Sequence, residues 1–295
     1  MTDTSRTAAA VAALLVAFTA CAGPAGYRER QVIDTNGSVA VADTTLNVEQ
    51  RGEGPPLLLV HGGGEDGSML AGQAEALAAA GYRVITYDRR GTGRSGRANW
   101  PGEGADQHAD DAAAVLDTLD AAPATVLGVS SGGLVALALA ARHPEAVARV
   151  IAWEPPASGV LPDAAAINAS IMAPIDAHLR EHPGDYVGAQ ALLLTVVLGF
   201  PVSADDPEFA AARANAEPMI RDEPAITLRP FTAAELTAVP VTIAVGTEPN
   251  ELIGAAAPVL GKLAGVEPEI VEGAGHEVYL TDPAVLAALV GPAGA

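Results

Sequence analysis

The sequence predicts an α/β fold with a mostly parallel, doubly wound sheet, and two patterns support this prediction. Short apolar runs rich in Val, Leu and Ile alternate with helical segments over much of the 295-residue chain. Such alternation is typical of strands joined by crossover helices, and continuous apolar runs are typical of strands buried on both faces. Hydrophobic residues make up 49% of the chain, which is enough for a large core.

Each element follows from its own residues. Two short runs, 39–42 and 45–48, are typical of a hairpin, and a Gly- and Pro-rich turn follows them. The elements expected next, in chain order, are a strand at 57–60, a helix at 68–80, a strand at 82–87, a helix at 108–120, a strand at 125–129, a helix at 131–142 and a strand at 150–153.

The alternation stops after residue 153, where Glu154-Pro155-Pro156 ends the strand. From 157 to 237 the pattern is helical and broken by prolines, and strands resume at 241–245 and near 269–271. We therefore expect a sheet-based core in two parts, 36–156 and 238–295, with a helical cap at 157–237. The cap is inserted before the last two strands and is expected to lie over the C-terminal edge of the sheet.

The N-terminal residues 1–21 are typical of an export signal. One arginine precedes an apolar run at 8–20, which is shorter than the roughly 20 residues that a membrane span needs. Phe18-Thr19-Ala20-Cys21 resembles the lipobox of bacterial lipoproteins, whose cysteine is lipidated after cleavage. We expect an exported protein anchored to the membrane through Cys21, or otherwise a secreted one or one with an uncleaved anchor. Residues 22–35 are expected to form a tether.

The charge balance limits the partners. There are 36 acidic and 16 basic residues, so the formal net charge is −20. A surface this negative repels phosphate backbones and anionic headgroups. We therefore exclude nucleic acid as a partner and expect membrane contact only through the N-terminal signal or lipid. Cys21 is the only cysteine, so no disulfide can form within the chain.

A candidate nucleophile lies between the predicted strand 125–129 and the predicted helix 131–142. Gly128-Val129-Ser130-Ser131-Gly132 matches G-x-S-x-G, in which two glycines allow the sharp turn that raises the serine above the sheet. Ser131 would need glycine at position 129, which is valine. The spacing therefore selects Ser130.

A serine hydroxyl needs a base within hydrogen-bond reach. His276 follows the last predicted strand, so its loop reaches the same edge of the sheet as Ser130. His61, His108 and His143 have local explanations in a turn, a helix start and a helix end. We therefore expect His276 to be the base.

The acid that orients the histidine has two candidate positions. Glu154 ends the strand beside the nucleophile strand, and a carboxylate there can stabilise the protonated imidazole. The other position follows the strand at 241–245, where Glu248 or Glu251 could serve. We favour Glu154 and keep Glu248 as the alternative acid.

An oxyanion hole requires backbone N–H groups aimed at the developing negative oxygen. His61-Gly62-Gly63-Gly64 follows the predicted strand 57–60, where such a loop is expected. We expect Gly63 and Ser131 to supply the two N–H groups.

These motifs together resemble the α/β-hydrolase superfamily over nearly everything after residue 35. The resemblance rests on the loop at 61–64, the segment from Asp88 to Ser95, the elbow and the glycine-rich turn before His276. It implies an α/β-hydrolase fold, and it implies a structural role for Asp88 to Ser95.

Within the superfamily, three segments are similar to lactone hydrolases of the zearalenone-degrading kind: the run that begins Ser130-Ser131, the segment 142–145, and Trp153-Glu154-Pro155-Pro156. Those enzymes and haloalkane dehalogenases take their acid from the strand after the elbow helix, which favours Glu154. Dehalogenases and epoxide hydrolases use an aspartate nucleophile, so Ser130 argues against both activities.

His178-Leu179-Arg180-Glu181-His182 matches H-x-x-E-H, a zinc pattern. No clear third ligand lies nearby and Pro183-Gly184 would end the helix, so we expect a solvated cap helix, no metal and no cofactor.

The sequence thus predicts a serine hydrolase that cleaves a carboxylic ester or lactone through an acyl-enzyme. The apolar stretch 191–200 favours an apolar small-molecule substrate if part of it lines the pocket. Hydrolysis of a peptide, thioester or C–C bond would use the same residues. A surface lipoprotein that keeps the fold only for ligand binding is the remaining alternative.

Overall fold

A computed structural model describes residues 35–294 of the chain. The predicted signal at 1–21, with Cys21, and positions 22–34 of the predicted tether lie outside the described residues. Over the described range, no helix combines the length and apolar character that a membrane crossing requires.

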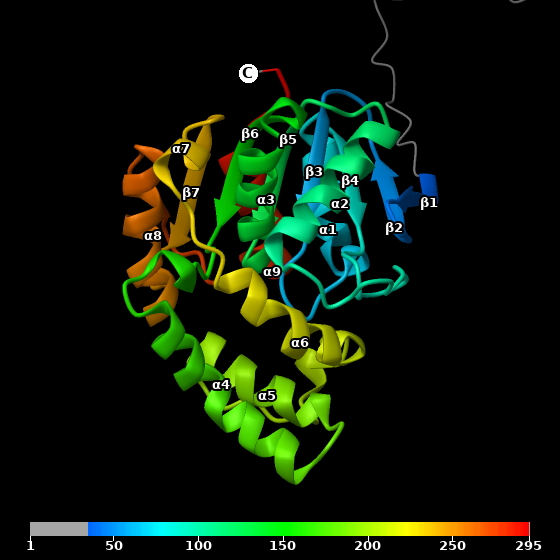
Figure 1. Ribbon diagram of the computed structural model, residues 1–295. Coiled ribbons are helices and arrows are strands. Elements are labelled where there is room, and N and C mark those ends of the chain that lie inside the picture. The colour runs from blue at the N-terminus through cyan, green and yellow to red at the C-terminus, as the bar shows by residue number, and fades with distance from the viewer. Residues whose placement is uncertain (1–34, 295) are drawn as a thin grey trace, which may run out of the picture. The chain divides into compact units, whose positions relative to one another are not determined.

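The centre of the molecule is an eight-stranded sheet with the order β1-β2-β4-β3-β5-β6-β7-β8 (Figure 1). The first two strands form an antiparallel hairpin, β2 pairs antiparallel with β4, and all later pairs are parallel. The strands are β1 (Thr35–Val41), β2 (Thr44–Arg51), β3 (Pro56–Val60), β4 (Arg83–Tyr87), β5 (Ala124–Val129), β6 (Val147–Trp153), β7 (Val241–Gly246) and β8 (Glu269–Val271). The predicted α/β class and mostly parallel sheet are confirmed.

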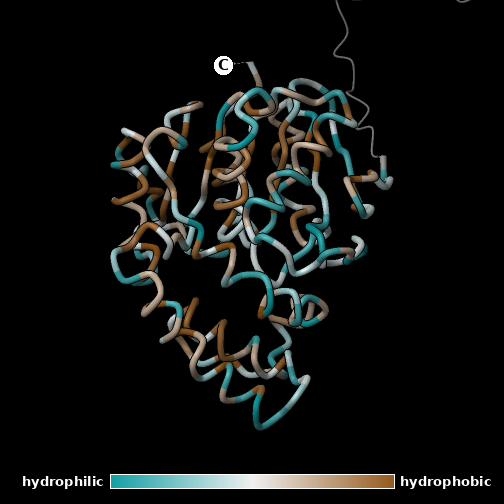
Figure 2. The backbone as a smooth tube through the Cα atoms, viewed as in Figure 1, coloured by the Kyte–Doolittle hydropathy of each residue, from teal (hydrophilic) through white to brown (hydrophobic). Residues whose placement is uncertain are grey.

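Helices cover both faces because the parallel strands are apolar on both sides. Leu57 and Leu59 of β3 contribute to one hydrophobic cluster, and Leu58 and Val60 to the other, as the alternation of side chains along a strand requires. Figure 2 shows hydrophobic residues concentrated in the central strands and in the helices beside them. One cluster includes α2 (Ala105–Thr118), α3 (Ser131–Arg142) and α8 (Glu251–Ala264), and the other includes α1 (Ala71–Ala79) and α10 (Pro283–Val290).

The elements between β6 and β7 form the helical region that the sequence predicts. Its longer helices lie beyond the C-terminal ends of the parallel strands, and the short helix before β7 lies at the other end of that strand (Figure 1). They have a small hydrophobic cluster of their own, which includes Ile175, Leu194 and Met219. The helices of this region are α4 (Ala164–Glu181), α5 (Tyr186–Leu198), α6 (Ala216–Thr227) and the short α7 (Ala233–Leu236).

Two buried side-chain pairs attach α6 to the core. Asp222 Oδ2 lies 2.6 Å from Nε2 of His108 on α2, and Arg89 Nη2 donates to Oε1 of Glu223 at 2.8 Å. All four residues are less than a tenth exposed. Because breaking a buried polar pair leaves an unpaired group, these contacts hold α6 in one position over the sheet.

Candidate active site

Ser130 occupies the sharp turn between β5 and α3. Its backbone has a φ of 51°, a left-handed conformation that side chains rarely adopt. A Cβ atom at Gly128 would lie 2.2 Å from the carbonyl oxygen of Gly132, and one at Gly132 would lie 2.3 Å from that of Val60. Both glycines of the G-x-S-x-G pattern are therefore required sterically, which explains the spacing found in the sequence.

The two neighbouring serines have different environments. Ser130 lines the main cavity, whereas Ser131 is only 1% exposed and does not contribute to the cavity lining. Ser131 is the first residue of α3, so its N–H is one of the free donors at the positive end of that helix. The fold thus presents the hydroxyl of Ser130 and the backbone N–H of Ser131.

His276 lines the same cavity as Ser130, from the loop after β8. Its Nδ1 lies 2.6 Å from Oε2 of Glu154, and its carbonyl oxygen accepts the indole N–H of Trp153 at 2.9 Å. Burial disfavours the imidazolium, but the hydrogen bond with Glu154 and the charge of Glu277 outweigh burial. Together they raise the pKa of His276 above its usual value.

Glu154 directly follows β6, has a left-handed conformation like Ser130, with a φ of 44°, and is 1% exposed. Its Oε1 accepts the backbone N–H of Gly246 at 2.9 Å, so both carboxylate oxygens have partners. A Cβ at Gly246 would lie 2.1 Å from the carbonyl oxygen of Ala274. The end of β7 therefore contributes an N–H that holds Glu154 and leaves room for the His276 loop.

The alternative acids lie elsewhere. Glu248 is exposed, and within the described part of the chain its carboxylate makes no hydrogen bond to His276. Glu251, the first residue of α8, lines the cavity but is also exposed. The structure brings Glu154, and neither Glu248 nor Glu251, to the imidazole.

The loop after β3 is fixed at Gly62. Its carbonyl oxygen lies 2.8 Å from Nδ1 of His61 and accepts Nη2 of Arg89 at 3.0 Å. The Arg89 backbone N–H donates to Nε2 of His61, so Nδ1 carries the proton and donates. Burial and the nearby charge of Arg89 hold the pKa of His61 well below its usual value, which keeps the ring neutral.

This arrangement decides where the Gly63 N–H points. In a trans peptide the C=O and the following N–H point in opposite directions. The Gly62 carbonyl faces His61 and Arg89, so the Gly63 N–H faces away from them. Among residues 35–294 it has no hydrogen-bond partner, and Gly63 lines the cavity with Ser130. The loop can therefore present one free N–H donor beside the serine.

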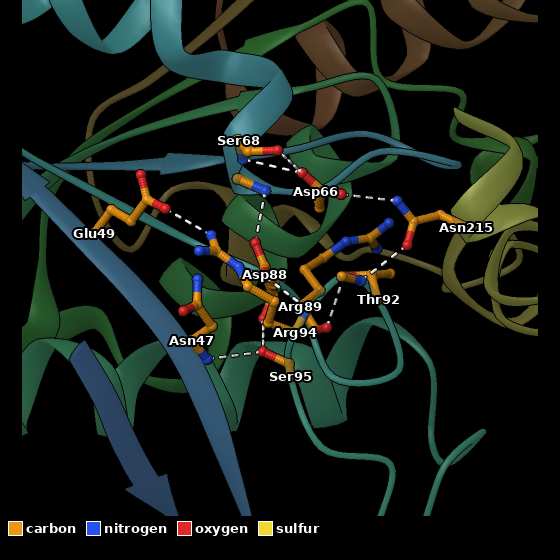
Figure 3. Close-up of polar contacts among 12 residues, drawn as sticks. Asn47, Glu49, Asp66, Ser68, Asp88, Arg89, Thr92, Arg94, Ser95 and Asn215 are labelled. Carbon is orange, nitrogen blue, oxygen red and sulfur yellow. Dashed lines mark hydrogen bonds and ion pairs between the residues drawn. The ribbon is translucent and has the colours of Figure 1, made fainter. Parts of the chain in front are cut away.

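The segment that follows β4 supports this loop (Figure 3). The carboxylate of Asp88 accepts the backbone N–H groups of Gly67 at 2.9 Å and Arg94 at 2.8 Å. Asn215, from the helical region, bonds both Asp66 and the Gly93 N–H. These contacts fix the segment that carries Arg89, whose Nη2 donates to the Gly62 carbonyl oxygen.

The cavity has a volume of about 600 Å³. Four of its lining residues, Leu193, Leu194, Val196 and Val197, come from α5, within the apolar stretch noted in the sequence. Four carboxylates also line it, on Glu65, Glu223, Glu251 and Glu277, and among the described lining residues there is no Lys or Arg. The cavity therefore has apolar side chains from α5 in its lining and more acidic than basic side chains among its ionisable groups.

The H-x-x-E-H segment lies at the end of α4. His178 Nε2 is 2.9 Å from Oδ2 of Asp185, and the rings of His178 and His182 lie 4.9 Å apart. In the described residues, no three His, Cys, Asp or Glu side chains are grouped as metal ligands would be.

Sequence reasoning did not find Glu65, Tyr279 or Glu223. Glu65 has a weak signal, because it lies one residue beyond the Gly-rich loop. The other two have none, because Tyr279 meets Glu65 across 214 residues and Glu223 meets Arg89 across 134.

Known proteins resemble this chain in sequence and in fold. A family model described as the alpha/beta hydrolase fold matches residues 55–172. The uncharacterized hydrolase YraK of Bacillus subtilis is 44% identical over 121 residues, which are 41% of this chain and 44% of that protein. The matches span less than half the length of the first curated relatives.

Solved structures extend the likeness to most of the chain. An α/β hydrolase from Sphaerobacter thermophilus has a TM-score of 0.68 and 27% identity, covering 86% of this chain and 98% of the other. The enol-lactonase of Burkholderia xenovorans has a TM-score of 0.60 and 26% identity, with the same coverage of 86% and 98%.

Proposed function

Because the chain belongs to the α/β-hydrolase superfamily, we propose that it is a serine hydrolase that cleaves a carboxylic ester or lactone through an acyl-enzyme. The observation that carries the proposal is the contact between His276 and Glu154, with Ser130 in the same cavity. A protein that only binds a ligand does not need a buried carboxylate on the far nitrogen of a cavity histidine.

The reaction begins when the Ser130 hydroxyl attacks the substrate carbonyl and His276 takes the hydroxyl proton at Nε2. Glu154 keeps the other proton of the ring on Nδ1 and stabilises the imidazolium. The N–H groups of Gly63 and Ser131 hold the negative carbonyl oxygen. His276 then protonates the departing alcohol oxygen, the C–O bond breaks, and the acyl group remains on Ser130.

Water completes the cycle. His276 removes a proton from a water molecule, which attacks the acyl carbon, and Ser130 leaves with that proton. A simple ester gives an alcohol and a carboxylic acid, and a lactone gives one hydroxy acid. The leucine and valine side chains of α5 favour an uncharged, apolar acyl group.

The test compares the two serines. Ser130→Ala is expected to abolish both hydrolysis of a panel of p-nitrophenyl esters and lactones and labelling by a fluorophosphonate. Ser131→Ala is the matched control and is expected to keep labelling, because its backbone N–H is retained. Loss of labelling only in Ser131→Ala, or hydrolysis that survives in Ser130→Ala, would refute the proposal. EDTA is expected to leave the rates unchanged.

A further inference from the structure

Glu65 lies in the cavity wall but takes no part in the steps proposed above. It is 5% exposed, and its two carboxylate oxygens have different partners. Oε2 accepts the backbone N–H of Gly62 at 2.7 Å, and Oε1 accepts the hydroxyl of Tyr279 at 2.9 Å. The carboxylate thus connects the Gly-rich loop to the helix that follows His276.

The contact with Gly62 is important because glycine has no side chain to restrict its backbone. His61 and Arg89 hold the Gly62 carbonyl, on one side of its Cα. Glu65 holds the N–H, on the other side. With both neighbouring peptide groups held, the two backbone angles of Gly62 are fixed, and so is the direction of the next N–H.

Gly62 is also close to the nucleophile. A Cβ atom built on it would lie 3.2 Å from Cβ of Ser130 and 3.2 Å from Oε2 of Glu65. A Cβ on Gly63 would lie 2.7 Å from Cδ of Glu223. The loop is therefore enclosed between these side chains. A small rotation of the Gly62 backbone would change the direction of the Gly63 N–H relative to Ser130.

We propose that Glu65 is a positioning residue of the oxyanion hole: by holding the Gly62 N–H, it aims the Gly63 N–H at the substrate's carbonyl oxygen. This inference rests on the proposed function, since it assumes that an oxyanion forms at Ser130. It assigns Glu65 no contact with the reacting atoms. Tyr279 in turn holds the carboxylate in place.

Glu65 also affects the charge state of the base. The groups that face the Glu65 carboxylate are Gly62, Tyr279, His276 and Glu277. The Arg89–Glu223 pair lies across the Gly-rich loop. Burial, followed by the charge of Glu277, raises the pKa of Glu65 to about 7. The charge of Glu65 contributes to the raised pKa of His276, together with Glu154 and Glu277. Removing that charge is therefore expected to lower the pKa of His276.

The test uses the full chain and a readout that needs no knowledge of the substrate. The second-order rate of Ser130 labelling by a fluorophosphonate is measured between pH 5 and 9 for the wild type, Glu65→Ala, Glu65→Gln and Glu272→Ala. The control Glu272 is exposed on the loop before His276 and has no contact with Gly62. Circular dichroism melting of each variant shows that it is folded.

Glu65→Ala is expected to slow labelling about 10- to 100-fold at pH 8, less than the 10²–10³ that loss of a whole oxyanion donor costs. Glu65→Gln is expected to keep most of the rate, because its amide oxygen still accepts the Gly62 N–H. In both variants the acid limb of the pH profile is expected to move to lower pH. Glu272→Ala is expected to match the wild type.

Three outcomes overturn the inference. A folded Glu65→Ala that labels at the wild-type rate would show that Gly62 does not need the carboxylate. Equal losses in Glu65→Ala and Glu65→Gln would show that charge, and not the hydrogen bond, is responsible. A wild type that neither labels nor hydrolyses any ester would refute the proposed function first, and the role of Glu65 with it.

Discussion

The imidazole of His276 is held by Glu154, from the end of β6, at 2.6 Å between Nδ1 and Oε2. Glu248, at the position after β7, is exposed. We therefore predict that Glu154→Gln loses most of its activity, because the ring can then adopt the wrong tautomer. In serine proteases the corresponding change costs on the order of 10⁴ in turnover.

The matched control for this prediction is Glu248→Gln, which removes a carboxylate of the same type from a loop surface. It is expected to keep near wild-type kcat and to change the free energy of unfolding by less than about 0.5 kcal/mol. Steady-state kinetics on the best ester of the panel measure kcat, and thermal melting measures the change in stability. Loss of activity in Glu248→Gln, with an active Glu154→Gln, would place the acid after β7.

The pH dependence of the reaction follows from the pKa of His276. The base works only when neutral, and a raised pKa keeps it protonated to a higher pH. The acid limb of kcat/KM is therefore expected to have its midpoint above about 6.5, the usual histidine value. In the residual activity of Glu154→Gln the midpoint is expected to be lower, because the hydrogen bond and charge that stabilise the imidazolium are reduced. A wild-type midpoint below 6.5 would contradict this prediction.

Substrate charge is predicted to affect the rate through the cavity carboxylates. A p-nitrophenyl ester whose acyl chain ends in a carboxylate is expected to have a kcat/KM at least about tenfold below that of a neutral ester of equal length, since like charges repel. Added salt is expected to narrow this difference.

Charge reversal at one lining carboxylate, compared with charge reversal at a carboxylate outside the cavity, tests this prediction further. Glu251→Lys, at a lining residue, is expected to raise the relative rate on the anionic ester. Glu269→Lys makes the same change on β8, at an exposed position that does not line the cavity. Equal rates on both esters in the wild type would show that the carboxylates do not select the substrate.

The buried pair of Asp222 and His108 is predicted to contribute to stability. Asp222→Ala leaves the histidine buried without its partner, which typically costs about 2–4 kcal/mol. Asp176→Ala, at an exposed position on α4, is the matched control and is expected to change stability by less than about 0.5 kcal/mol. Urea unfolding followed by circular dichroism compares the two. Equal unfolding midpoints would show that the pair does not stabilise the folded chain.

The parts of the molecule that depend on neighbouring residues in sequence were predictable. The strand runs and the G-x-S-x-G turn are local patterns, and the clashes that a Cβ would make at Gly128 and Gly132 explain why the spacing is strict. Helix α8 was not predicted, and it contains Pro258 and two glycines, which weaken a helical pattern. The roles of Glu65 and Glu223 depend on contacts that only the folded chain brings together.

In the helical region, the side chains that attach it to the core and most of its apolar lining residues lie on different helices. Helix α6 carries Asp222 and Glu223, the two carboxylates bonded to His108 and Arg89 of the core. Glu223 also lines the cavity, but much of the apolar lining comes from α4 and α5, whose lining residues take no part in those pairs. The size and shape of the acyl pocket can therefore change by substitutions on α5 while α6 keeps its place above the serine. Related enzymes that share the α6 anchor but differ in α5 would then accept different acyl groups with the same catalytic centre.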